Sequence, residues 1–247
     1  MNITVDAHVH TILTNHAYST IEENCLHGGE NGMRAIVISD HFGTYEKNNI
    51  ENIIAGIANR KVLPKSMHQI EIIHGVELDI MNENGQLEHD GIPYYYDHSK
   101  TVLEVAFECS DLVIASVHKV NLSYTINQNT NEYLKALENP NVHILGHCGR
   151  MGQPFNIKEV VRGARIQNKA IELNAVTLCN PASEKRCRDI AVMCATENTK
   201  ITIGSDAHCA YSVGVFDKMK EMLRTIDFPE DLVLCYSIER IKEFFKL

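Results

Sequence analysis

The sequence predicts an α/β barrel of parallel strands, and three observations support this fold class. The chain has 247 residues, a length typical of one barrel domain, so we expect a single domain over 1–247. Short apolar runs rich in β-branched residues alternate with segments of helical spacing, which favours parallel strands joined by helices. Six of the seven runs end in a histidine or a carboxylate, and active sites lie at the C-terminal ends of barrel strands.

Each run has the length of a buried strand. In chain order the runs are ITVDAHVH (3–10), RAIVISDH (34–41), IEIIHGVELDI (70–80), DLVIASVH (111–118), NVHILGH (141–147), KAIELN (169–174) and KITIGSDAH (200–208).

Helical segments lie between the runs. Ser19 and Glu22 have the spacing of a capping box at the start of the first helix. Asn84-Gly85 is a hairpin turn signal after the third run. Apolar residues recur at amphipathic spacing in four later segments, 157–167, 184–198, 216–226 and 238–246.

Composition excludes several classes of protein. The net charge is −9, from 23 basic and 32 acidic residues, and without a basic stripe we expect no binding to long nucleic acids. No apolar run is long enough to cross a membrane, and the N-terminus lacks the pattern of a signal peptide. The eight cysteines are scattered without a C-x-x-C pair, which favours reduced thiols and a cytoplasmic location.

The polar ends of the strands indicate a metal site. His8 and His10 are two residues apart on the first run, so both imidazoles point to the same face and reach one ion. A core strand needs only apolar residues, and packing does not explain a histidine or carboxylate at most strand ends. In a parallel barrel these ends converge, which predicts a metal centre at the C-terminal face.

The motifs DAHVHT, ISDH, GVELDI, ASVH, GHCG and GSDAH, in this order, resemble the PHP family (polymerase and histidinol phosphatase). The continuation NHAYST and the tail from 216 onward are most similar to the stand-alone YcdX-like phosphatase subgroup. The resemblance spans nearly the whole chain. It implies a distorted (β/α)7 TIM-like barrel that hydrolyses phosphate esters with a trinuclear cluster of zinc, manganese or iron, of which we favour zinc.

The resemblance also implies the ligands of the three divalent ions. One ion is held by His8, His10, Glu77 and Asp206. Glu77 bridges to a second ion, whose other ligands are His118 and His147. The ligands of the third ion are His16, His41 and His208. The nucleophile is a metal-bound hydroxide. Glu77, Asp206, Asp40 and Arg150 are the supporting catalytic candidates, with Asp40 expected either to hydrogen-bond a ligand imidazole or to cap a helix.

Substrate-binding candidates come from the loops on the same face. They are Arg150, Lys119, Lys185, Arg186, Arg188 and Tyr95, although each charge taken alone is more often a solvated surface charge. The segment 88–111 is longer than in the subgroup, and we expect an extra helix and part of a cap over the site, with a tyrosine contacting the substrate. The alternative is that its tyrosines pack a helix against the barrel or form an oligomer contact. Cys148 replaces a proline common in the family, and Cys209 follows His208; small buried thiols are the simplest interpretation.

We therefore expect a metal-dependent phosphomonoesterase acting on a small phosphorylated metabolite, with no membrane partner and with a homo-oligomer left open. The alternatives are a phosphodiesterase or exonuclease on short oligonucleotides or nucleotides, and a histidinol phosphatase, which the tail disfavours. An amidohydrolase would need an eighth strand and would leave His16 and His41 without a role. A metal-binding regulatory module would tolerate gaps in the ligand set, and the sequence has none.

Overall fold

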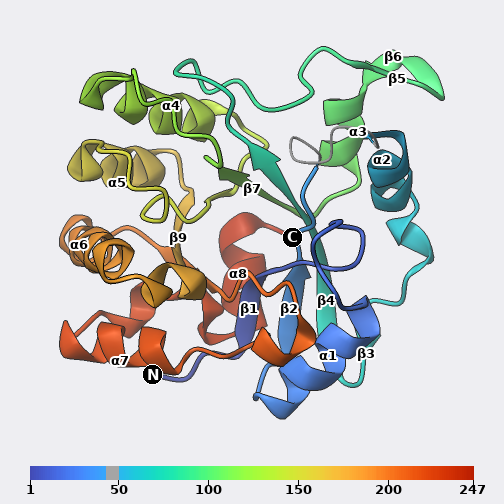
Figure 1. The fold of residues 1–247 in the computed structure, drawn as a ribbon. Helices are drawn as coiled ribbons and strands as arrows, with labels where there is room; N and C mark the ends of the chain where they lie inside the picture. Colours follow the sequence, from blue (N-terminus) through green and yellow to red (C-terminus); the bar gives the residue numbers. More distant parts are fainter. Residues whose placement is uncertain (43–49) are drawn as a thin grey trace.

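A computed structural model describes residues 1–42 and 50–247, and its main element is a sheet of parallel strands (Figure 1). The order of its strands is β1 (Val5–Val9), β2 (Ala35–Ile38), β4 (Ile70–Asp79), β7 (Leu112–Ser116), β8 (Ile144–Leu145), β9 (Ala170–Asn174) and β10 (Ile201–Gly204). Every neighbouring pair in this order is parallel. The short strand β3 (Ser66–Met67) adds antiparallel to β4.

The first and last strands meet and nearly close the sheet into a barrel. A parallel bridge joins Val9 to Ala207. The backbone N–H of Asp206 donates to the carbonyl of His8 over 2.8 Å, and that of His10 donates to Ala207 over 2.9 Å. Each of the seven predicted runs contains one barrel strand, so the predicted α/β barrel is confirmed.

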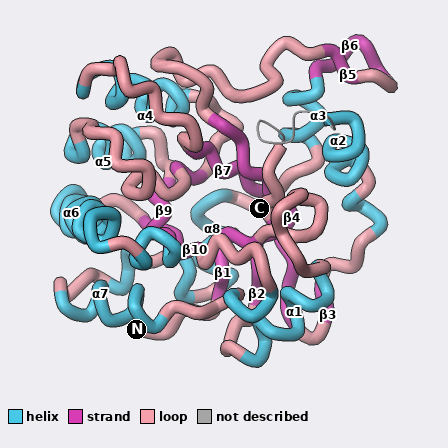
Figure 2. Tube along the Cα trace, in the orientation of Figure 1, coloured by secondary structure: helices cyan, strands magenta, loops and turns pink. Residues whose placement is uncertain are grey.

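Helices surround the barrel (Figure 2). They are α1 (Ile21–Glu30), α2 (Ile50–Ala58), α3 (Val102–Glu108), α4 (Ile126–Glu138), α5 (Ile157–Ile166), α6 (Pro181–Glu197), α7 (Asp217–Thr225) and α8 (Ile238–Phe245). Short 3-10 turns complete the connections as η1 (Arg60–Val62), η2 (Ala175–Cys179), η3 (Ala210–Ser212), η4 (Glu230–Leu232) and η5 (Leu234–Tyr236).

The start of α1 corrects one prediction. The capping box is made by Thr20 and Glu23, one residue later than the predicted pair of Ser19 and Glu22. Ser19 Oγ instead accepts a hydrogen bond from the backbone N–H of Ala210 over 2.9 Å. The hydroxyls of Ser19 and Thr20 both suit an N-cap. Thr20 takes this role, and Ser19 connects the loop after β1 to the loop after β10.

The barrel strands are buried on both faces. All residues of β1, β2, β7, β9 and β10 are buried, as expected for parallel strands covered by helices. Burying each large aliphatic side chain contributes about 1.5–3 kcal/mol. The polar residues in these strands therefore lie in a rigid, water-poor environment.

The segment 88–111 does not contain an extra helix. It forms a hairpin of β5 (Pro93–Tyr94) and β6 (Asp97–Thr101), followed by α3, which is the ordinary crossover helix between β4 and β7. Tyr95 and Tyr96 are 70% and 77% exposed. They line a hollow of about 430 Å³ against α2, and no predicted metal ligand is among its described lining residues. We expected Tyr95 at the site, but the hollow that it lines is a different one.

Within the described part of the chain, no helix combines the length and the apolar character that crossing a membrane requires.

Candidate metal centre

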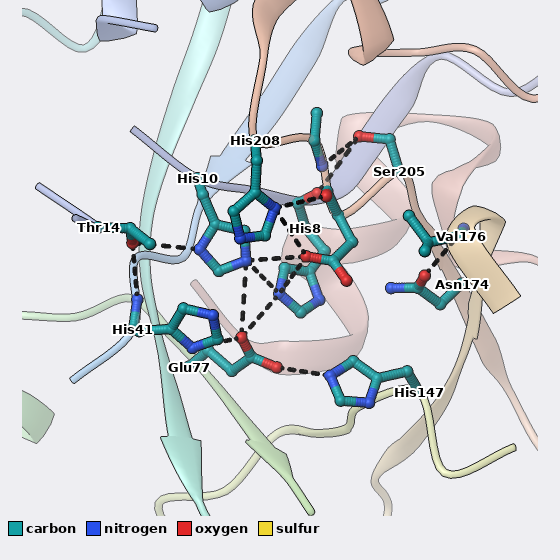
Figure 3. A network of polar contacts seen from close by, with 12 residues as sticks. His8, His10, Thr14, His41, Glu77, His147, Asn174, Val176, Ser205 and His208 are labelled. Atoms are coloured by element: carbon teal, nitrogen blue, oxygen red, sulfur yellow. Dashed lines mark hydrogen bonds and ion pairs between the residues drawn. The ribbon is translucent and has the colours of Figure 1, made fainter. Parts of the chain in front are cut away.

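The barrel brings all nine predicted ligands to the C-terminal ends of its strands, where most of them point toward one another (Figure 3). They come from the end of β1 and the loop after it (His8, His10, His16), from the end of β2 (His41), from β4 (Glu77), from the loops after β7 and β8 (His118, His147) and from the loop after β10 (Asp206, His208).

Glu77 lies at the centre of this group and is 1% exposed. Its Oε1 lies 2.9 Å from His147 Nε2 and 3.4 Å from His118 Nε2. Its Oε2 lies 3.2 Å from His8 Nε2 and 3.0 Å from His41 Nδ1. The two oxygens thus face different sets of imidazoles, which is the geometry of a bridging carboxylate.

The other ligands complete two further groups. His10 Nε2 lies 3.0 Å from Asp206 Oδ1, and His8 Nε2 lies 3.9 Å from the same oxygen. The ring of His208 lies 4.3 Å from that of His10 and 4.6 Å from that of His16, measured between centroids. His16 is exposed at the rim. Among the residues that the structure describes, three sets have the spacing of a metal site, namely His8, His10 and Asp206; His10, His41 and His208; and His41, Glu77 and His118.

Buried carboxylates orient two of the imidazoles. His8 Nδ1 lies 2.9 Å from Glu172 Oε1, and His118 Nδ1 contacts Asp79 Oδ1. A carboxylate accepts only, so each ring carries its proton on Nδ1 and directs the lone pair of Nε2 toward the centre. This is the arrangement that histidines adopt when they bind a metal through Nε2.

A hydroxyl orients His10 in the same way. Thr14 Oγ1 donates to Asp40 Oδ1 over 3.0 Å, so it can only accept from His10 Nδ1 at 3.3 Å. Asp40 also accepts from Thr11 N–H over 2.6 Å and pairs with Arg60 at 3.4 Å. The expectation that Asp40 touches an imidazole or caps a helix is therefore wrong; it acts on His10 through Thr14.

The donor set fits a metal cation. His8 Nε2 and His10 Nε2 lie only 3.1 Å apart, and the tautomers above make both of them lone-pair acceptors. Two such atoms repel unless a positive centre lies beside them. Glu77 Oε2 and His208 Nε2 are also buried without a hydrogen-bond partner among the described residues. Imidazole and carboxylate donors in this number suit zinc, manganese or iron.

The electrostatics of the site favour ionised carboxylates. Burial alone would raise the pKa of Glu77, but the charges of His8, His118 and His41 outweigh burial and hold this pKa well below its ordinary value. Burial acts in the same way on Asp206 and is outweighed by His8, so the pKa of Asp206 also lies well below its ordinary value. Burial lowers the pKa of His41 to about 2. Burial lowers the pKa of His8 and His118, but Glu172 and Glu77 outweigh burial and raise both values above the ordinary one, so a metal would bind these two rings by displacing their protons.

Arg150 is a predicted substrate contact that reaches the centre. Its guanidinium pairs with Asp206 Oδ2 and donates to Asn174 Oδ1 over 3.0 Å. Its Nε is buried and has no hydrogen-bond partner among the described residues. Arg186 Nε donates to the carbonyl of Gly149 over 2.9 Å, so Arg186 supports the loop that carries Arg150 and does not itself contact the centre.

Two other predicted cations bind surface groups. Lys185 pairs with Asp189 at 2.8 Å and its side chain is 77% exposed. Arg188 donates to Thr225 Oγ1 over 2.8 Å. Neither of these contacts involves a candidate metal ligand, and the two expectations of a substrate contact stay predictions. Lys119 is exposed directly after His118.

The thiols predicted to be small buried residues beside the ligands differ in exposure: Cys148 is buried and Cys209 is partly buried.

The sequence analysis missed the partners that orient the ligands. Glu172 lies two residues before Asn174 in a run that is otherwise apolar, and Asp79 follows Glu77 by two residues. Each is a carboxylate on the inward face of a buried strand, which is a signal that could have been used. Thr14 and Arg60 carry no such signal.

The comparisons with known proteins agree with this geometry. A model of the PHP domain matches residues 6–176. A probable phosphatase of Clostridium acetobutylicum is 32% identical over 249 residues, which cover 100% of this chain and 96% of that protein. A probable phosphatase of a Thermoanaerobacter species is 35% identical over 250 residues, with the same shares covered.

Two solved structures share the fold. A histidinol phosphate phosphatase of Lactococcus lactis, solved with zinc, L-histidinol and phosphate, has a TM-score of 0.60 at 18% identity, covering 93% of this chain and 95% of that one. A chain from an archaeal ribonuclease P solved with mature tRNA has a TM-score of 0.55 at 15% identity, covering 97% of this chain and 90% of that one. At these identities the likeness concerns the fold alone.

Proposed function

Since this chain belongs to the PHP domain family and is a phosphate ester hydrolase, we propose that it removes the phosphoryl group from a small phosphorylated metabolite with the help of three divalent metal ions. The observation that carries the proposal is the convergence of seven imidazoles and the carboxylate of Asp206 around Glu77. A complete ligand set at the mouth of a barrel is costly to build, and hydrolysis is the chemistry it serves.

The nine residues divide among the three ions as follows. His8, His10, Asp206 and Glu77 would hold the first ion, and Glu77, His118 and His147 the second. His16, His41 and His208 would hold the third ion. The distances from Glu77 to His8, His118 and His147 and the ring contacts of His16 with His41 and His208 support this division, whereas His41 also lies 3.0 Å from Glu77 Oε2.

When bound, divalent ions lower the pKa of a water molecule and neutralise phosphoryl oxygens. The chain itself supplies orientation and charge. Ser116 Oγ donates to Glu77 Oε1 over 2.6 Å and holds its rotamer. Arg150 stays cationic, because although burial opposes the charged form, Asp206 raises the pKa of Arg150 above its ordinary value. The side chain of Arg150 is 24% exposed, so its guanidinium is the candidate partner for a phosphoryl oxygen.

A monoester of small size fits the surroundings of the centre better than a diester in a long strand. The chain has a net charge of −9, and Lys185 and Arg188, which would have extended a cationic surface, are engaged away from the centre. Binding of a nucleic acid backbone requires a run of basic contacts. Zinc is the favoured ion because the donors are mostly imidazole.

The test is elemental analysis of the purified protein combined with hydrolysis of p-nitrophenyl phosphate and bis-p-nitrophenyl phosphate with added Zn²⁺ or Mn²⁺. We expect close to three ions per chain and a preference for the monoester. His10→Ala and Asp206→Ala should abolish turnover in a folded protein, whereas His27→Ala, on the outer surface of α1, should not. Preference for the diester, or normal turnover by either site variant, would contradict the proposal.

A further inference from the structure

A hollow of about 310 Å³ adjoins the candidate metal centre on the side of β9 and β10. Asp206 and His208 form one wall of it, so it opens directly onto two predicted ligands. Tyr18 and Val176 line the other side. The backbone N–H of Tyr18 donates to the carbonyl of His208 over 2.8 Å, which fixes this tyrosine beside the ligand.

A second hollow of about 440 Å³ continues the first. The two share Val176, Ser205 and Ser212 as lining residues, so they form one groove, which we call the β9–β10 groove. Figure 3 shows Val176 beside Asn174, next to the group of ligands. The second hollow extends the groove over η2 and the start of α7, and its further lining residues are Ala175, Cys179, Val215, Asp217, Lys218 and Met219.

The lining of the groove is mainly apolar although it is open to solvent. Tyr18, Val176 and Val215 are 81%, 45% and 49% exposed. A single exposed valine is ordinary on a protein surface. Three exposed apolar side chains along one hollow that begins at two metal ligands have the character of a binding site for an apolar group. Apart from Asp206 at the metal centre, the charged residues among the described lining are Asp217 and Lys218 at the far end.

We propose that the β9–β10 groove binds the alcohol portion of the phosphate ester and selects alcohols with an apolar ring over small polyols. The inference rests on the proposed function, because the phosphoryl group must lie at the metal centre. The alcohol then leaves from that centre, and the groove is a continuous hollow that begins at Asp206 and His208. Its apolar walls stabilise a ring by burial, and they offer few partners to the hydroxyls of a polyol.

Two substrates with alcohols of similar acidity test this selection. Benzyl phosphate carries a ring and glycerol 3-phosphate does not, so a difference in kcat/KM reports binding rather than leaving-group reactivity. We expect benzyl phosphate to be preferred about tenfold or more, a factor typical of an apolar pocket. The double variant Val176→Asn/Val215→Asn should reduce this preference about tenfold. Val192→Asn, at a valine on α6 that is 46% exposed, is the matched control and should not.

Cys179 gives a second measurement that does not require turnover, because this exposed thiol lines the groove. Saturating benzylphosphonate should slow its alkylation by a maleimide at least fivefold relative to methylphosphonate, while Cys109, the C-cap residue of α3, should react at the same rate with both.

The outcomes separate the two proposals. Equal kcat/KM for the two substrates in an active phosphatase would overturn the groove proposal and leave the phosphatase proposal standing. Equal alkylation of Cys179 with both phosphonates would also overturn it. If neither ester were hydrolysed, the proposed function would be contradicted. Protection of Cys179 by benzylphosphonate but not by methylphosphonate would then still support the groove.

Discussion

Glu172 makes the sharpest test of the metal centre, because it orients two predicted ligands and is not itself one. Its Oε1 lies 2.9 Å from His8 Nδ1, and its Oε2 accepts the backbone N–H of His147 over 2.7 Å. It is 3% exposed. The substitution Glu172→Gln keeps the shape of this side chain and replaces one acceptor oxygen with an NH₂ group. Whichever way the amide turns, an N–H faces another N–H.

The expected magnitudes follow from these contacts. One buried donor loses its acceptor, which costs about 1–3 kcal/mol of the free energy of unfolding. His8 also loses the anionic partner that holds its proton on Nδ1, and loss of such a partner typically lowers metal affinity about 10–100-fold. We therefore expect a modest decrease in stability and a much larger decrease in metal affinity.

Chelator competition for Zn²⁺ measures the affinity, and urea unfolding of the metal-free protein measures the stability. Glu132→Gln is the matched control, because Glu132 is also 3% exposed and accepts a hydrogen bond from Gln153 over 3.1 Å, remote from the ligands. This control should bind metal normally. If Glu172→Gln bound Zn²⁺ as tightly as Glu132→Gln, the assignment of His8 as an oriented metal ligand would be refuted.

Three further predictions concern buried charges. Arg60→Met leaves the buried carboxylate of Asp40 without its cation and should lower the free energy of unfolding in urea by about 3–5 kcal/mol. Adding Asp40→Asn to the same chain should restore part of this stability. An unchanged free energy of unfolding in Arg60→Met would show that the pair is unimportant. Burial raises the pKa of Glu132 from 4.5 to about 7, so the folded state keeps a proton that the unfolded state has lost, and the free energy of unfolding should fall by up to about 3 kcal/mol between pH 4.5 and 7. Glu132→Gln should remove this dependence from unfolding curves recorded at pH 5 and pH 8, and an identical dependence in the variant would assign it to other groups. Arg150→Ala should raise KM for p-nitrophenyl phosphate about tenfold because it removes a charged partner of the phosphoryl group, and unchanged kinetics would exclude Arg150 from substrate binding.

The strands and the ligand positions could be predicted from the sequence because they follow from short-range rules. Residues two apart on a strand share a face, which relates His8 to His10. Parallel strands place all their C-terminal ends on one side, which relates Glu77 to Asp206 across 129 positions of the chain (206 − 77). Neither inference needs the register between strands. The family resemblance then supplied the division of the ligands among ions.

The partners of the ligands depend on that register and could not be predicted. Glu172 meets His8 because β9 and β10 pair with Glu172 opposite Thr202, and because β10 lies beside β1 at the seam of the barrel. A shift of one residue in either pairing would turn Glu172 to the other face. Asp40 illustrates the same limit, since its position beside His41 suggested a contact with an imidazole, whereas its oxygens accept from Thr11 and Thr14.

Residues on loops and on outer helix faces are less predictable still, for a different physical reason. The direction of a side chain on a barrel strand is restricted because both faces of the strand are covered, so a polar residue there can adopt few orientations. Lys185 and Arg186 are adjacent in sequence, yet one pairs with Asp189 in solvent and the other donates to the carbonyl of Gly149, because neighbours on a helix point about 100° apart. The spacing within α6 predicts that Lys185 and Arg186 point in different directions. Which of the two contacts the loop after β8 depends on the position of that loop, which the sequence does not give. The β9–β10 groove arises in the same way, from loops whose apolar residues have no periodic pattern. This is why the class of reaction can be inferred from the sequence, whereas the proposed preference for one alcohol over another is argued from the structure.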